Sequence, residues 1–401
     1  MNTSKATGNA PLYWMALGTF AVGTESFMIA GLLPAMARDL AVSTAAAGQL
    51  VTVFALAYAI SSPVLTALSG RIGRRALLIG AMTIFAAANL LAWQASSYWQ
   101  LMAARVLLAF AAGLYVPGAN SLASAVVAPE RRGTAIAIVN GGLSLAIAFG
   151  VPLGALLGEG AGWRATFAAV AGLAALAALG LTIGLPKGFG ANLKVPTLAA
   201  RLQAAAQPAV LSTLLVTTLW AMASYTTYTY LALLIGAATG IEGGKVGWFL
   251  FAWGAAAALG LAIAARRVDR HGSQSVIVPS LLTSTAAFIL LSASALALPP
   301  KLAVLPMLAA IVAWGVAHWA FYPAQQTRLV GVAGVAAAPI VLSLNASFMY
   351  AGFSLGAAFG SLTITALGVA NIGFASALCM AAALALSFAN ARRFSPSATP
   401  A

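Results

Sequence analysis

Twelve apolar runs, each long enough to cross a lipid bilayer, dominate this sequence of 401 residues. A membrane-spanning helix needs about 20 mostly apolar residues, and only helices and closed barrels satisfy every backbone hydrogen bond in hydrocarbon. The expected helices lie near residues 12–36, 46–68, 76–95, 99–127, 133–158, 163–185, 208–236, 244–265, 275–298, 302–323, 335–366 and 370–391. The sequence therefore predicts an all-α membrane protein with twelve transmembrane helices.

Composition and charge exclude other classes of protein. The chain is 62% hydrophobic and 6% charged, whereas a soluble domain carries roughly a quarter charged residues. The net charge of +14 comes from basic residues scattered between apolar runs, so we expect no nucleic-acid partner. With both termini in the cytoplasm, inside segments hold fifteen basic residues and outside loops hold four. The positive-inside rule favours that orientation.

The chain reads as two similar halves joined by a polar segment. We expect an N-terminal six-helix bundle over residues 1–185, a cytoplasmic linker over 186–207 and a C-terminal six-helix bundle over 208–401. A loop motif supports this division, because Gly70-Arg71-Ile72-Gly73 is echoed by Asp269-Arg270-His271-Gly272 at an offset of 199 residues. The fold class expected is two pseudo-symmetric six-helix bundles with a binding site between them, an architecture of transporters.

A glycine row repeats at almost the same offset. Gly150, Gly154 and Gly158 recur 202 residues later as Gly352, Gly356 and Gly360. Glycines every four residues lie on one helix face and allow another backbone to approach closely. Pro152 lies within the first row and Pro117 within the fourth run, and we expect bends at both.

Two charged residues lie well inside expected spans, Glu25 in the first and Arg105 in the fourth. A charge at the bilayer centre costs about 2.5 to 3.5 kcal/mol on insertion scales, so such residues normally pair and mark a pathway or a proton relay. Burial favours the neutral form of a carboxyl, and a nearby arginine favours the charged form. Glu25 is therefore a candidate for proton exchange, and a static structural contact is the alternative.

Polar and aromatic side chains at helical spacing mark candidate walls of a substrate cavity. The seventh run carries Thr213, Thr217, Trp220, Ser224 and Tyr228. The tenth carries Trp314, His318, Phe321, Tyr322 and Gln325. Asn140 and Asn345 occupy near-equivalent places in the fifth and eleventh runs. Packing between helices is the alternative for each of these residues.

Signals for enzymatic chemistry are missing from the sequence. It has no HExxH motif, no Walker phosphate loop and no nucleophile elbow, and six acidic residues cannot assemble a metal cluster here. We therefore expect no enzyme activity, no metal and no cofactor other than the proton as coupling ion. The lone Cys379 excludes an intramolecular disulfide.

Three stretches resemble the major facilitator superfamily, and within it the bacterial twelve-helix drug:proton antiporters of the arabinose-efflux-permease-like branch. The run from Gly23 to Pro34 is similar to that branch's opening signature, whose acid, here Glu25, the family uses for proton coupling. Arg105 matches the buried arginine of the fourth helix, and Ala109 stands where glycine often follows. Gly150, Pro152 and Gly154, followed by the stretch from Gly162 to Phe167, resemble the antiporter motif that is associated with exporters.

The loop repeat resembles the superfamily's cytoplasmic gate motif. The matching residues are Arg71, Gly73, Arg74 and Arg75 in the first copy and Asp269, Arg270 and Gly272 in the second. The first copy departs from the family pattern, with Gly70 in place of aspartate and Thr66 in place of glycine, and the second copy keeps Asp269.

The resemblance implies proton-driven efflux of small hydrophobic or amphipathic compounds by alternating access. Glu25 would exchange the proton and Arg105 would tune it. We expect a functional monomer in the bacterial cytoplasmic (inner) membrane, with the lipid bilayer and a small-molecule substrate as its partners. Efflux of a sugar or another metabolite is one alternative, and a non-transporting membrane sensor is another. A membrane-embedded enzyme would need a catalytic set that the sequence does not show.

Overall fold

Twelve apolar helices long enough to cross a membrane form the protein, as the sequence predicts. The computed structural model describes residues 9–125, 127, 131–187, 197–334 and 337–393, and of Arg71 only the backbone. Within these ranges the chain is helical and has no strands. The first six spans are α1 (Ala10–Asp39), α2 (Thr44–Leu68), α3 (Arg74–Gln94), α4 (Tyr98–Ala125), α5 with α6 (Arg132–Leu145 and Val151–Ala161) and α7 (Trp163–Gly184). The other six are α9 with α10 (Pro208–Tyr228 and Leu231–Thr239), α11 (Val246–His271), α12 (Gln274–Ala297), α13 (Pro300–Ala333), α14 (Ala338–Leu367) and α15 (Ile372–Arg393).

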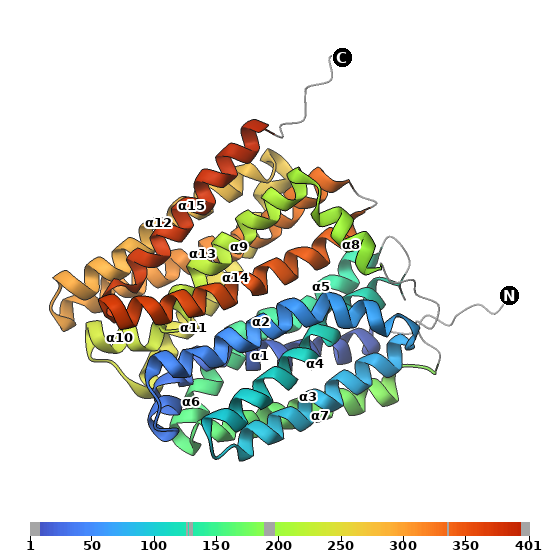
Figure 1. The fold of residues 1–401 in the computed structure, drawn as a ribbon, viewed down its shortest axis with the longest axis horizontal. Coiled ribbons are helices and arrows are strands. Elements are labelled where there is room, and N and C mark those ends of the chain that lie inside the picture. The colour runs from blue at the N-terminus through green and yellow to red at the C-terminus, as the bar shows by residue number, and fades with distance from the viewer. Residues whose placement is uncertain (1–8, 126, 128–130, 188–196, 335–336, 394–401) are drawn as a thin grey trace. The chain divides into compact units, whose positions relative to one another are not determined.

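The helices group into two units by their contacts. Unit 1 comprises residues 1–43 and 60–195, and unit 2 comprises residues 44–59 and 196–401. In unit 1, α1 packs against α5 and α7, and α3 packs against α4 and α7. In unit 2, α9 packs against α14 and α15, and α12 packs against α13 and α15 (Figure 1). In both units, the first span thus packs against the fifth and sixth spans, and the third span packs against the fourth and sixth.

The fifth span is interrupted where its proline falls. Between α5 and α6, residues Ala146–Gly150 form a π-helix, and Pro152 follows within the first turn of α6. Proline has no N–H and its ring conflicts with the carbonyl four residues earlier. A π turn widens the helix locally, and such turns occur often at functional sites. The interruption of the α-helix therefore ends at Gly150, the first residue of the glycine row.

Three segments differ in extent from the sequence prediction. The tenth helix, expected to end near residue 323, continues through Pro323 to Ala333, because membrane helices tolerate proline where neighbours satisfy the freed carbonyl. The seventh span breaks at Thr229 and Tyr230 before α10 begins. The linker segment contains a short helix, α8 (Leu198–Ala205), capped by the side chain of Thr197 and held to unit 2 by a hydrogen bond from Arg201 to Ser343.

The two glycine rows serve different contacts. A Cβ at Gly154 would lie 3.3 Å from Cβ of Met28 on α1, so at this row a side chain of α1 faces the fifth span. A Cβ at Gly356 would overlap the backbone carbonyl O of Met222 on α9. In the same interface of unit 2, the Thr226 hydroxyl donates to the carbonyl O of Gly356 at 3.2 Å. Backbone meets backbone there, as small residues allow in membrane helices.

We predict that Gly356→Ala destabilises the protein and that Gly154→Ala is nearly neutral. Forcing a methyl group against a fixed backbone costs about 1 to 3 kcal/mol, which corresponds to a fall of about 2 to 12 °C in apparent Tm for a unit of this size. Thermal unfolding of both purified variants in one detergent measures the difference. Equal melting of the two variants would show that the α9–α14 contact is looser than described.

Candidate functional site

Glu25 and Arg105 form an ion pair inside unit 1. Glu25 lies on α1 and Arg105 on α4, and both side chains are 0% exposed. Nη1 of Arg105 donates a hydrogen bond to Oε1 of Glu25. The two charges that the sequence singled out are therefore in direct contact, which lowers the cost of burying either one alone.

Half of the Glu25 carboxylate lacks a hydrogen-bond donor. Within the described part of the chain, Oε2 of Glu25 is buried without a partner, as are the hydroxyls of its neighbours Thr24 and Ser26. Buried polar atoms are nearly always paired, so an unpaired oxygen on a carboxylate requires an explanation. Chemically, Oε2 is a position where a proton can bind without first displacing another group.

The antiporter-like motif of the fifth span lies against the residue that precedes Glu25. A Cβ added at Gly150 would meet the side chain of Thr24. Gly150 also ends the π-helix that precedes Pro152. Gly150 of the motif therefore allows the fifth span to lie close to α1 at Thr24, the residue before Glu25. A change in the π-helix that ends at Gly150 would alter the packing next to Glu25.

A polar network joins three helices of unit 2. The Thr217 hydroxyl on α9 donates to Oδ1 of Asn345 on α14 at 2.8 Å. From α13, Nε2 of Gln325 donates to the carbonyl O of Thr213 at 2.8 Å and to the Thr217 hydroxyl at 3.3 Å. All four side chains are buried. The polar stripe of the seventh span thus faces α13 and α14 rather than lipid.

An aromatic cluster surrounds His318 in the same unit. The ring of Trp220 is stacked on His318 with a centroid distance of 4.3 Å and on Phe321 at 4.7 Å. The rings of Trp253 and Trp314 lie 5.5 and 6.2 Å from that of His318. We call Trp220, Trp253, Trp314 and His318 the tryptophan cluster. Nδ1 of His318 is hydrogen-bonded to the Ser224 hydroxyl at 3.0 Å.

Tyr228 extends the tryptophan cluster along α9. Its ring lies 4.9 Å from that of Trp253 and 6.2 Å from that of Trp314. Sequence reasoning selected Tyr228 but missed Trp253, because Trp253 stands alone in an apolar run with no polar neighbours at helical spacing.

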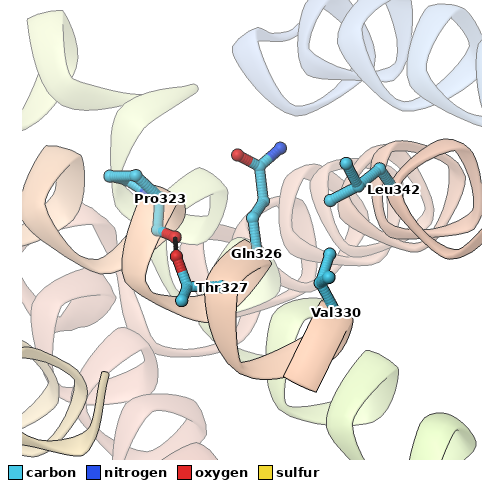
Figure 2. A pocket seen from close by; sticks show the side chains of 5 residues that line it. All are labelled: Pro323, Gln326, Thr327, Val330 and Leu342. Carbon is cyan, nitrogen blue, oxygen red and sulfur yellow. Dashed lines mark hydrogen bonds between the residues drawn. The ribbon is translucent and has the colours of Figure 1, made fainter. Parts of the chain in front are cut away.

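A pocket of about 370 Å³ opens on α13 and α14 beside this cluster. It is lined by Pro323, Gln326, Thr327, Val330 and Leu342. Figure 2 shows the amide of Gln326 extending between Pro323 and Leu342, with the Thr327 hydroxyl bonded to the Pro323 carbonyl at 3.0 Å. Its volume falls within the range of small-molecule sites. None of its residues was selected from the sequence, because side chains of two helices, α13 and α14, form the pocket together.

Tyr322 connects this pocket with the interior of unit 2. Its phenol interacts with the amide of Gln326 on the pocket side and with that of Asn345 on the inner side. Its ring is stacked on Trp220 with a centroid distance of 6.0 Å.

Of the expected cavity residues, Asn140 belongs to unit 1, where Asn120 donates a hydrogen bond to it at 3.2 Å.

The two copies of the loop motif are built differently. Arg75 donates to the carbonyl oxygens of Leu185 and Thr182, both at 2.7 Å, and so caps the C-terminus of α7. Arg74 is buried and follows Gly73, the residue before α3, whereas the side chain of Arg71 lies outside the described residues. In the second copy, Asp269 and Arg270 are exposed at the end of α11, which Gly272 terminates with a φ of 76°.

Comparisons with known proteins cover almost the whole chain. A sequence profile described as Major Facilitator Superfamily matches residues 15–236. "Inner membrane transport protein YdhP" of Escherichia coli is 34% identical over 96% of this chain and 97% of its own length. The "Chloramphenicol resistance protein" of Streptomyces lividans is 33% identical over 94% and 95%.

A solved structure of the same fold shares little sequence. The bacterial homolog of the human lysosomal transporter Spinster, in an inward-facing and occupied conformation, superposes with a TM-score of 0.81 at 19% identity and covers 98% of both chains. At that identity the likeness concerns the fold alone.

We predict that the ion pair is coupled in stability. Arg105→Met leaves the Glu25 carboxyl buried without its cation, at a cost of about 3 to 5 kcal/mol, whereas removing both charges with Glu25→Gln and Arg105→Met costs less. Thermal unfolding of the single and double variants tests this as a double-mutant cycle. A double variant that melts at or below the temperature of Arg105→Met would contradict the coupling.

Proposed function

The chain belongs to the major facilitator superfamily of membrane transporters, and from that membership we propose that it exports small hydrophobic or amphipathic molecules in exchange for protons. It is a multi-pass inner-membrane protein with twelve apolar helices. The observation that carries the proton-coupling proposal is the buried pair of Glu25 and Arg105, in which one carboxylate oxygen has no partner in the described chain.

The proposed coupling step takes place at the Glu25 carboxylate. A proton that binds Oε2 neutralises the acid, and the attraction that holds Arg105 to Oε1 is then lost. Loss of the proton restores the pair. Because Gly150 packs on Thr24, the state of Glu25 is adjacent to the bend in the fifth span. A proton gradient can in this way favour one arrangement of α1 and α6 over another during alternating access.

The similarity to a chloramphenicol resistance protein supports efflux of drug-like compounds. The tryptophan cluster and the pocket of unit 2 also suit flat, largely apolar molecules, because aromatic rings supply broad apolar contact. Sugars and other metabolites form the alternative substrate class, and a panel that includes both classes separates them. No catalytic step is assigned to the chain, whose family consists of transporters.

We predict that Glu25→Gln abolishes proton-coupled transport and that Glu159→Gln does not. Glutamine keeps the size of the side chain but cannot exchange a proton, and Glu159 is an exposed carboxyl on α6 that serves as the matched control. Proton release from purified protein is measured on addition of chloramphenicol, other drugs and a set of sugars. Equal release from wild type and Glu25→Gln would remove Glu25 from the coupling role.

The same panel tests the substrate class. Proton release on addition of sugars but not of drugs would favour efflux of sugars or other metabolites over efflux of drugs. If no compound elicits proton release from folded wild-type protein, the antiporter proposal itself fails.

We predict an inside position for the loop after α11 and an outside position for the loop before it. In a Cys379→Ser background, Glu242→Cys and His271→Cys place one thiol at each end of α11, at residues that are both exposed. A membrane-impermeant maleimide is expected to label Glu242→Cys in intact cells and His271→Cys only after the membrane is opened. The reverse pattern would invert the proposed orientation.

A further inference from the structure

The tryptophan cluster contains several buried hydrogen-bond donors that the protein leaves unused. In the described part of the chain, the indole N–H groups of Trp220, Trp253 and Trp314 have no acceptor, and these side chains are between 0 and 2% exposed. Leaving such a donor unpaired costs about 1 to 3 kcal/mol. Three unused donors in one aromatic cluster therefore favour a ligand that supplies acceptors.

Acceptors are scarce in the same region. Among the side chains of the polar network, Oε1 of Gln325 is the acceptor atom that lacks a partner in the described chain. The site therefore offers more hydrogen-bond donors than acceptors. A complementary ligand has more acceptors than donors, for example nitro, carbonyl or ether oxygens.

Charge argues against a cationic ligand in this unit. Of the six acidic residues in the chain, Glu242 and Asp269 are the ones in unit 2, and both are exposed at opposite ends of α11. No carboxylate is thus available inside unit 2 to neutralise a cation. A cation over an aromatic face is also disfavoured at Trp220, because its ring is already stacked on His318 and Phe321. The indole edge remains available.

The pocket of Figure 2 is linked to the tryptophan cluster by neighbouring side chains. Gln326 lines the pocket, Tyr322 interacts with Gln326, and the ring of Tyr322 is stacked on that of Trp220 with a centroid distance of 6.0 Å. Gln326 and Tyr322 of α13 therefore lie between the pocket and the cluster.

From these contacts we infer that unit 2 binds an uncharged aromatic molecule rich in hydrogen-bond acceptors, with its acceptor-bearing part directed at the indole N–H groups of Trp220, Trp253 and Trp314. The inference rests on the proposed function and narrows it, because it selects uncharged compounds from the wider class of drug-like substrates. The aromatic ring of the ligand would stack on the rings of the cluster, and hydrogen bonds from the indole N–H groups would select ligands that carry acceptors.

The test compares two probes on purified protein. Chloramphenicol is uncharged and carries nitro and amide oxygens, whereas tetraphenylphosphonium is an aromatic cation without acceptors. Trp220→Phe, Trp253→Phe and Trp314→Phe each keep an aromatic ring and remove one N–H. We predict that each weakens chloramphenicol binding by about three- to tenfold, as expected for one net hydrogen bond, and leaves the weaker binding of tetraphenylphosphonium unchanged.

Two further variants serve as controls. Trp248→Phe removes an indole N–H from a residue of α11 that is 70% exposed, and it is expected to change neither affinity. Asn345→Asp replaces the amide by a carboxyl group that can carry a negative charge, at nearly constant size, and it is expected to weaken chloramphenicol binding and to strengthen binding of the cation. Thermal unfolding shows which variants are folded. If a tryptophan variant does not fold, Asn345→Asp is used in its place.

The outcomes separate this inference from the proposed function. Chloramphenicol affinities within twofold of wild type in the folded tryptophan variants would overturn the inference, as would tighter binding of tetraphenylphosphonium than of chloramphenicol by wild type. Glu25-dependent transport of the cation alone would overturn it and leave proton-coupled efflux intact. Tryptophan-dependent binding without proton release would support the inference and contradict the coupling.

Discussion

The absence of water from the bilayer interior is the constraint on which this structure depends. Hydrocarbon offers no hydrogen-bond partner, so each backbone group must be satisfied within a helix and each polar side chain must find a neighbour. Most polar groups here obey that rule, as Thr217, Asn345 and Gln325 do together. Other buried polar atoms in the described part of the chain have no partner, and they occur in both units. Two sets of them underlie the proposals about function, namely Oε2 of Glu25 in unit 1 and the indole N–H groups of the tryptophan cluster in unit 2.

The two units have diverged in chemistry while keeping one packing plan. Equivalent spans choose equivalent neighbours in both, yet the buried charges lie in unit 1 and the tryptophan cluster in unit 2. The second position after the loop motif shows the same divergence, because Arg75 caps α7, whereas the equivalent residue of unit 2 is Gln274, whose side-chain amide has no hydrogen-bond partner in the described chain. Similar helix packing thus carries different buried chemistry in the two units.

Sequence patterns predicted the spans and the ion pair because both follow from the cost of polarity in lipid. One acid and one arginine in apolar runs are each costly to bury alone in hydrocarbon, so they are expected to pair. The pocket was not predicted, because its lining combines side chains of α13 with Leu342 of α14, and no pattern within either helix shows that they meet. Trp253 was not predicted either, since its role depends on contacts with α13 that no periodicity in α11 reveals. The π-helix, too, depends on how Pro152 is accommodated by its surroundings.

The unequal glycine rows have a consequence for how the two units tolerate change. In unit 1 the row faces side chains such as Thr24 and Met28, which can be exchanged for larger or smaller ones and so reset the spacing of α1 in small steps. In unit 2 the row faces the α9 backbone, which has no side chain to exchange. Along these rows, substitution can therefore adjust the packing of unit 1 in small steps, whereas the α9–α14 contact admits no such adjustment.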